Sequence, residues 1–268
     1  MIGDLPLGYA TLGDFESHMA RTFAESDRQI ANQLLRTAEE LINYHTGDRL
    51  FVPVKSTITA AIAADATSAY LDTDSCAFPS GGFIYIDSEV LEYTAPVAQE
   101  GRVKVTLRTR GVGETTAASH LSGANVSVVR GIRGAGACSL YPGDFLEVQQ
   151  IWTGAATTVG WLATDIDYVV QMPLEYAPPF QWLERSGGWS KGALYWVAAT
   201  WGYAWSVPAS IQRATLLLAE NMLLQRGANL RLIATEQWEG WSVRYRNLTA
   251  MPNDVLELLQ PYRRIPLC

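Results

Sequence analysis

The residues best suited to chemistry are thinly spread along this chain of 268 residues. Its three histidines, His18, His45 and His120, lie far apart, and none belongs to an H-x-x-H or H-E-x-x-H pattern that would bind a metal ion. We interpret them as surface or helix-end histidines. The three cysteines have no C-x-x-C spacing, which predicts neither a disulfide framework nor a zinc site. We therefore expect no bound metal.

The sequence also gives little support for a catalytic nucleophile or a phosphate-binding loop. We find no serine or cysteine that we would assign to a Ser–His–Asp or Cys–His arrangement. The glycine-rich stretch Arg130–Ser139 matches neither the dinucleotide-binding nor the P-loop pattern, and we interpret it as a hinge between modules. The sequence predicts a protein that is not an enzyme, has no catalytic residues and needs no cofactor.

Acidic residues gather in the first half of the chain and would be the candidates for a calcium site. They are Asp65, Asp72, Asp74, Asp87 and Glu89. The 12-residue calcium-loop pattern is missing, so strand-end turns and a solvated acidic face are the preferred interpretation. The net charge of −7 disfavours general binding to nucleic-acid phosphates. We find no signal peptide and no apolar run near the ~20 residues of a membrane span, so we expect a cytoplasmic, non-membrane protein.

Two helical regions should position the rest of the chain. Residues 14–44 carry apolar side chains at helical spacing, and Pro208 opens a second helix that we expect to end near Arg226 and to pack on the first. Pro252 opens a terminal helix that extends to about Arg264. The expected core residues of the first two helices are Ile30, Leu34, Leu35, Leu41, Ile42, Ile211, Leu218 and Met222.

The region between the helices changes character. Six short β-prone runs are expected in residues 56–130, at 57–62, 69–71, 83–86, 90–94, 103–108 and 126–129. They predict an inserted all-β domain, a small barrel or sandwich, in an α+β protein. Further strands at 145–152, 168–172 and 193–200 predict a small sheet in the core. The expected domains are 1–55 and 131–268 for the core and 56–130 for the insertion.

Four stretches together resemble the head–tail connector (adaptor) proteins of tailed bacteriophages. They are Leu34–Pro53, Thr164–Val170, Thr200–Gly227 and Met251–Arg264. In that family a strand ending in Gly-Tyr leads through a proline into a helix, as at Gly202-Tyr203 and Pro208 here. The family's chain ends near Leu-x-Pro-Tyr-Arg-Arg, as at residues 259–264. The resemblance covers 1–55 and 131–268, and the stretch Leu107–Val129 resembles a small β-module of phage tail and baseplate proteins.

The resemblance implies a structural virion protein at the head–tail interface, assembled in the host cytoplasm. Such proteins form a ring, here expected as a homo-dodecamer, beneath the portal protein. DNA passes through the lumen without sequence-specific binding, and the ring also meets the next tail or head-completion protein. The resemblance further implies that residues 252–268 dock on the portal. The docking residues would be Pro252, Leu258, Leu259, Pro261, Tyr262, Arg263 and Arg264.

Two other function classes remain open. A carbohydrate-binding or lytic tail-associated protein would use a platform of tryptophans, and lysis would also need two carboxylates across a cleft. The platform candidates are Trp152, Trp161, Trp182, Trp189 and Trp201. A DNA-binding module would use the basic residues of the C-terminal region and the aromatic residues among them. The basic residues are Arg244, Arg246, Arg263 and Arg264. Arginine among aromatic side chains also suits a protein interface. The acidic balance disfavours DNA.

Overall fold

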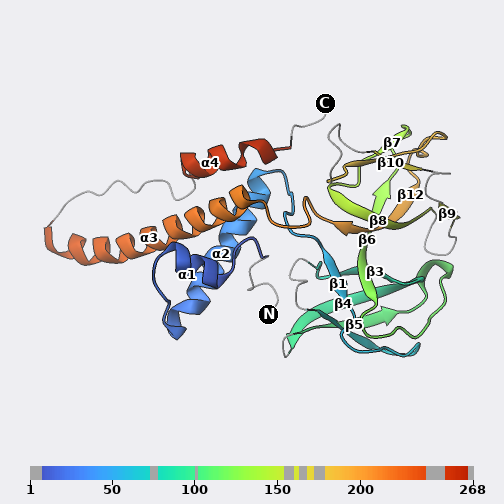
Figure 1. Ribbon diagram of the computed structural model, residues 1–268, viewed down its shortest axis with the longest axis horizontal. Helices are drawn as coiled ribbons and strands as arrows, with labels where there is room; N and C mark the ends of the chain where they lie inside the picture. The colour runs from blue at the N-terminus through green and yellow to red at the C-terminus, as the bar shows by residue number, and fades with distance from the viewer. Residues whose placement is uncertain are drawn as a thin grey trace. The chain divides into compact units, whose positions relative to one another are not determined.

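The computed structural model describes residues 8–72, 78–99, 102–153, 160–162, 168–171, 179–239 and 251–264. The chain divides into two units (Figure 1). The helical unit joins Asp4–Arg49 to Val207–Cys268, so it is built from both ends of the chain. The β unit holds Leu50–Ser206. The fold class is therefore α+β, as the sequence predicts.

In its described residues, the helical unit contains four α-helices and a short 3-10 helix. They are α1 (Leu12–His18), α2 (Glu25–His45), α3 (Ala209–Glu239), α4 (Asn253–Leu259) and η4 (Gln260–Tyr262). Helices α2 and α3 pack against each other, and α4 packs on α3. Helix α3 is thus the packing partner that the sequence predicts for α2.

The expectation of one helix over residues 14–44 is wrong, because the chain turns between α1 and α2. Ala20 adopts a left-handed conformation with φ of 49°, which alanine disfavours. The turn lets the ring of Phe23 pack on that of Phe15, with centroids 5.3 Å apart, and both side chains are buried. Tertiary packing of two aromatic rings therefore overrides local helical propensity here.

Side-chain and backbone caps fix the ends of these helices. Thr11 and Asp14 form a capping box at the start of α1, with bonds of 2.8 and 3.1 Å between each backbone N–H and the other side chain. At the end of α2, Gly47 adopts φ of +80°. The N–H groups of Gly47 and Asp48 donate to carbonyls of the last turn. This is a Schellman motif, and it confirms Gly47 as the predicted cap.

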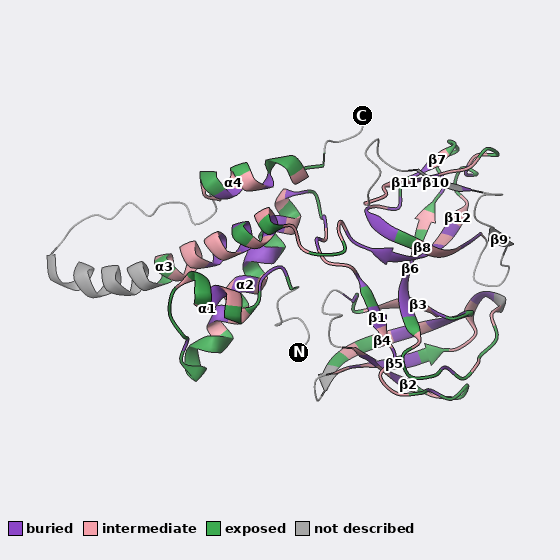
Figure 2. Ribbon diagram, in the orientation of Figure 1, coloured by how far each residue is buried: buried purple, intermediate pink, exposed green. Residues whose placement is uncertain are grey.

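Helix α2 has buried and exposed positions (Figure 2), and the buried ones match the expected stripe only in part. Its buried positions are Ala31, Leu35, Ala38, Glu39 and Ile42. Leu41 is 40% exposed, so its expected place in the core is wrong. Adjacent residues of a helix point about 100° apart, so Leu41 faces away when Ile42 faces α3. Ile30 and Leu34 are half-buried at the edge of the face.

The buried carboxylate Glu39 ties the start of the chain to α2. Its Oε1 accepts backbone N–H bonds from Gly8 at 3.1 Å and Tyr9 at 2.8 Å. The Tyr9 hydroxyl is hydrogen bonded to Asn43 one turn later. A buried carboxylate is tolerable only with such donors, so this polar residue on an apolar face is explained.

Helix α3 continues to Glu239, which is 13 residues beyond its expected end at Arg226. A single glycine at position 227 weakens a helix by only about 1 kcal/mol, and the following residues are mostly good helix formers. Pro208 lies just before the helix, and its carbonyl accepts the N–H of Ile211 at 2.9 Å. Ile211 and Leu218 are buried, whereas Met222 is half-buried.

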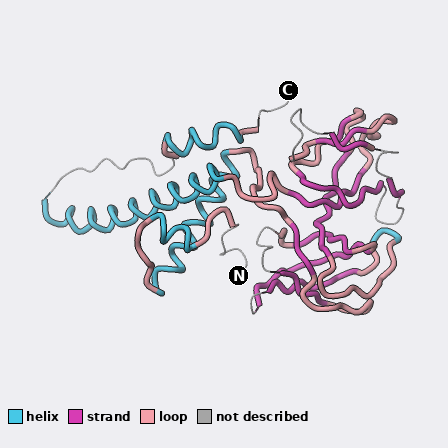
Figure 3. The backbone as a smooth tube through the Cα atoms, viewed as in Figure 1, coloured by secondary structure: helices cyan, strands magenta, loops and turns pink. Residues whose placement is uncertain are grey.

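The described part of the β unit consists mainly of strands and loops (magenta and pink in Figure 3), and its strand pairings are antiparallel. Its larger sheet has the strand order β2-β5-β4-β3-β6-β12-β8-β9, with β1 also pairing with β6, and a second sheet has the order β10-β11-β7. The strands are β1 (Lys55–Thr57), β2 (Ser68–Asp72), β3 (Gly81–Ile86), β4 (Glu89–Gln99), β5 (Arg102–Thr109), β6 (Asn125–Arg133), β7 (Ser139–Leu140), β8 (Phe145–Thr153), β9 (Gly160–Leu162), β10 (Val169–Gln171), β11 (Trp182–Glu184) and β12 (Leu194–Trp201), with a 3-10 turn η3 (Val112–Glu114).

Strand β6 crosses the expected domain boundary at residue 130. It pairs with β3 through residues 126–129 and with β12 through residues 128–133. Its first residues pair with β1. The strands expected as a separate insertion therefore share one sheet and one unit with those expected in the core. The unit boundaries lie at residues 49/50 and 206/207, so the division differs from the expected one.

The larger apolar core of the β unit draws on both halves of the unit. It includes Ile84 and Val105 from the first half and Val197 and Trp201 from the second. The indole N–H of Trp201 donates to the carbonyl of Val128 at 2.7 Å, within β6. Trp201 is fully buried, so its ring joins the two halves of the unit as a core residue.

The α2 face provides a direct test of the helix packing. Leu35→Ala should lower the free energy of unfolding by about 2–5 kcal/mol, because it opens a cavity under a fully buried side chain. Leu41→Ala, the matched control one and a half turns away, should lower it by less than about 1 kcal/mol. Urea unfolding followed by circular dichroism measures both. Equal losses would contradict the orientation of α2.

Candidate docking surface

The C-terminal segment proposed from the resemblance folds onto the helical unit. Helix α4 turns Val255 and Leu259, four residues apart, into the unit, and both are fully buried. The hydroxyl of Tyr262 is hydrogen bonded to Ser210 of α3 at 2.7 Å. The N–H of Arg264 donates to the carbonyl of Thr46, at the end of α2. Residues 252–264 therefore form an ordered surface.

The seven predicted docking residues divide by exposure. Pro261, Arg263 and Arg264 are exposed, and Pro252, Leu258 and Tyr262 are half-buried. Leu259 is 0% exposed, so its prediction as a contact residue is wrong for this fold. The i, i+4 spacing that pairs Leu259 with Val255 places it in the core.

Positive charge gathers where this segment meets the end of α2. Burial, and then the positive charge of Arg263, lower the pKa of His45 below its ordinary value. Arg264 lies against Gly47, whose missing side chain leaves room for it. The carbonyl end of a helix attracts cations, so the end of α2 favours arginines at this place. Together, Pro261, Arg263 and Arg264 form an exposed cationic patch, which we call the tail patch.

The histidines occupy three different environments. His18 contacts the carboxylate of Glu220 on α3 at 2.8 Å. His45 lies beside the tail patch. His120 was expected on the surface, but it is 2% exposed and that expectation is wrong. Its ring nitrogens lie 2.7 Å from Asp87 and 2.8 Å from Glu89, so both ring nitrogens face carboxylates.

Glu89, expected on a solvated acidic face, is instead the centre of a buried ionic cluster. Its carboxylate is 0% exposed and binds Arg110 through two bonds of 2.7 and 2.8 Å. The N–H groups of Gly111 and Ala118 donate to it at 2.9 and 3.0 Å. Burial alone would raise the pKa of Glu89, but these bonds and that from His120 lower it from 4.5 to about 2.

This cluster attaches the loop between β5 and β6 to the sheet. Arg110 also donates to the carbonyls of Ala63 and Ala118, so the loop is held at several points. The donors come from residues 20 or more positions from Glu89, a separation that no local sequence pattern reveals. Glu89 and His120 are buried, and the cluster serves the fold. The described residues contain no group of three acidic, histidine or cysteine side chains suited to a metal ion. Asp74, one of the calcium candidates, lies outside the described residues.

One motif escaped the sequence analysis. Gly188-Trp189-Ser190-Lys191-Gly192 fits the G-x-S-x-G pattern of hydrolase nucleophiles, which is formed by a turn from a strand into a helix. Here the pattern lies in a turn between β11 and β12, two strands. Trp189 is fully buried and its indole N–H donates to the carbonyl of Leu183. The motif is therefore a strand-connecting turn.

The described side chains of the predicted tryptophan platform do not form one. Trp152, Trp189 and Trp201 are buried in the core, and Trp182 is half-buried. The side chain of Trp161 lies outside the described residues, as do residues 240–250 with Arg244 and Arg246. Tryptophans spread over several strands point to different sides of the sheets, so their number alone predicts no platform.

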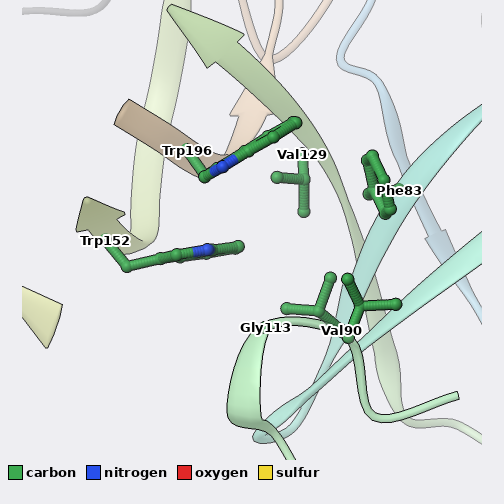
Figure 4. A pocket seen from close by; sticks show the side chains of 7 residues that line it. Phe83, Val90, Gly113, Val129, Trp152 and Trp196 are labelled. Carbon is green, nitrogen blue, oxygen red and sulfur yellow. The ribbon is translucent and has the colours of Figure 1, made fainter. Parts of the chain in front are cut away.

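An apolar cavity of about 20 Å³ lies beside Trp152 and Trp196. Figure 4 shows both indole rings reaching from neighbouring strands toward Val90 and Val129. The ring of Phe83 meets that of Trp196 edge-on, with centroids 5.2 Å apart. This volume would hold about one water molecule, so the cavity is a packing defect and no ligand site.

The Glu89 cluster gives a stability prediction with a defined pH dependence. Glu89→Gln should lower the free energy of unfolding by about 3 kcal/mol or more at neutral pH, because it leaves Arg110 and His120 without their carboxylate. The pKa of Glu89 is lower in the folded protein, so its contribution is present above pH 4.5 and is lost as the pH falls toward 2.

The difference in the free energy of unfolding between Glu89→Gln and the unchanged protein should therefore shrink as the pH falls from 4.5 toward 2. Urea unfolding at a series of pH values measures it. Glu92→Gln, on the same strand and bonded to Thr109 at 2.8 Å, is the control and should have a much smaller effect. A pH-independent difference for Glu89→Gln would refute the assignment.

Comparisons with known proteins add little. Among the described residues no helix is long and apolar enough to cross a membrane. No protein-family model and no curated protein matches the chain. A solved structure described as the neck of an empty GTA particle, computed with C6 symmetry, is similar over 98% of this chain and 94% of that chain. The sequence identity is 15% and the TM-score is 0.38, a likeness too slight to bear on fold or function.

Proposed function

We propose that this chain is a structural virion protein, a head-to-tail adaptor that forms a ring beneath the portal and lets DNA pass between capsid and tail. One observation carries the proposal. Three stretches that resemble connector proteins lie far apart in the sequence, in α2, at the start of α3 and in α4, and these helices pack into one unit.

The tail patch is the proposed portal contact. Arginine beside aromatic and proline side chains is typical of residues that dominate protein interfaces. The buried residues Val255 and Leu259 hold α4 in place, so the outward side of the segment is what a portal would meet. We assign the contact to Pro261, Arg263 and Arg264, with Pro252, Leu258 and Tyr262 at its margin.

The proposed assembly is a homo-dodecameric ring with no catalytic role. The net charge of −7 suits a channel past which DNA slides without specific binding, because acidic walls repel phosphates. The ring would join the next tail or head-completion protein on its other side. It would assemble in the host cytoplasm and remain at the head–tail interface of the virion.

Assembly is the first test. The purified chain, alone or mixed with portal protein, should form rings of twelve copies in electron micrographs and a matching mass in native mass spectrometry. A chain that stays monomeric in both mixtures, or that is absent from purified particles, would overturn the proposal.

The tail patch is the second test. Arg263→Glu should weaken attachment to portal-bearing heads by about thirtyfold or more, because it places a like charge or an unpaired one in the interface. Arg226→Glu, an exposed arginine of α3, is the control with the same charge change. Melting temperatures of both variants should match the unchanged protein. Equal attachment by the two variants would exclude the tail patch as the contact.

A further inference from the structure

Helix α2 carries a second stripe of mostly apolar residues besides the face that packs in the helical unit. Its members follow one another at alternating spacings of four and three residues, and they are Ile30, Leu34, Thr37, Leu41 and Tyr44. This spacing keeps side chains on one side of a helix and is the pattern through which two helices pack side by side. Leu41 is 40% exposed and Tyr44 is 81% exposed. We call these five residues the outer stripe.

The outer stripe faces away from the residues of α2 that pack in the helical unit. Successive residues of an α-helix are turned by about 100°, so the middle of the stripe lies about 120° around the helix from the middle of the buried face. A contact with the outer stripe therefore leaves the packing of α2 on α3 intact. From Ile30 to Tyr44 the stripe is about 21 Å long, which is the length of two heptads.

The outer stripe is complementary to itself when two copies of α2 lie antiparallel. Thr37 then lies opposite Thr37 of the second copy, on the twofold axis. Leu34 lies opposite Leu41, and Ile30 lies opposite Tyr44, because the members of each pair are almost equally far from Thr37 along the helix. The small side chain at the axis leaves room for the leucines on either side. Each contact occurs twice, as a twofold interface requires.

The charges at the two ends of α2 match the same arrangement. Asp27, exposed in the first turn, and His45 are separated by 18 residues, or five whole turns, so they lie on one flank of the outer stripe. The positive charge of Arg263 acts on His45, and the N–H of Arg264 donates to the carbonyl of Thr46. The tail patch therefore lies at the far end of α2 from Asp27. In an antiparallel pair the acidic end of one α2 meets the tail patch of the other copy, whereas a parallel pair would bring like charges together.

We propose that the free chain forms a twofold dimer in which the outer stripes of two copies pack antiparallel and each tail patch meets the Asp27 end of the other copy. A contact of two heptads is short, so we expect a weak and reversible dimer. The dimer covers the tail patch. Resting on the proposed function, it is a storage form of the chain that gives way when the tail patch binds the portal.

Sedimentation velocity of the purified full chain, without portal protein and over a hundredfold range of concentration, tests the dimer. We expect a reversible equilibrium between monomer and dimer. Leu41→Glu should raise the dissociation constant tenfold or more, because it places a charge from each copy against apolar side chains. Leu224→Glu, at an α3 leucine that is 59% exposed and outside the outer stripe, is the matched control and should change it less than twofold. Both variants should melt at the temperature of the unchanged protein.

Two further sets of variants test the charges and the orientation. Asp27→Arg should weaken the dimer severalfold, and Asp27→Arg combined with Arg263→Asp should restore it, since the two charges are exchanged. In a chain whose native cysteines are replaced by serine, Thr37→Cys should form a disulfide across the twofold axis under mild oxidation. Gln33→Cys, exposed one turn earlier on α2, should form none, because its counterpart in an antiparallel pair lies two turns away.

The proposal is overturned by a free chain that shows no dimer at any concentration, by equal dissociation constants of Leu41→Glu and Leu224→Glu, or by equal cross-linking of Thr37→Cys and Gln33→Cys. These measurements contain no portal protein, so their failure is distinguishable from failure of the adaptor role. The cross-linked Thr37→Cys dimer should attach to portal-bearing heads at least tenfold more weakly than its reduced form. Equal attachment would overturn the storage role.

Discussion

Strand β6 is the constraint on which the β unit depends, because it must satisfy hydrogen bonds along both edges at once. One edge is taken by β3, and the other is divided between β1 and β12. No division of the unit at residue 130 is possible without breaking these ladders. The bond from the Trp201 indole to Val128 adds a side-chain link across the same strand.

The helical unit is held together by a different principle. Its helices come from opposite ends of the chain, and their contacts are mostly apolar, with a few buried polar exceptions such as Glu39. Each exception has a structural partner close by. The tail patch is held in a similar way, because two buried residues of α4 anchor the segment and the arginines that follow it stay exposed.

Much of the helical part could be predicted from the sequence, because helix signals are local. Pro208 and Pro252 mark the two later helices, and the spacing of Leu35 and Ile42 predicts the buried face of α2. The prediction that Leu41 is buried is wrong because the apolar stripe of α2 is wider than the face that packs in the core. The sequence therefore does not show which residues at the edge of the stripe face inward. The turn at Ala20 depends on packing between Phe15 and Phe23, which no local pattern predicts.

The β unit was harder to predict for a physical reason. Individual strands are visible as short β-prone runs, but their partners depend on residues far along the chain, and so the continuity through β6 remained hidden. The same limit applies to the burial of Glu89 and His120, which depends on residues far along the chain. Exposure is also invisible in composition, so the sequence alone cannot show that Trp152, Trp189 and Trp201 are buried.

The first and last segments of the β unit, residues 50–54 and 201–203, lie next to each other. The N–H of Tyr203 donates to the carbonyl of Leu50, and the N–H of Val54 donates to the carbonyl of Trp201, both at 2.7 Å. A body whose ends meet adds little closure entropy to the chain that carries it, whatever its length. The helical unit can therefore tolerate exchange or enlargement of its β unit over evolutionary time, so related chains with similar helices and very different middle portions are expected.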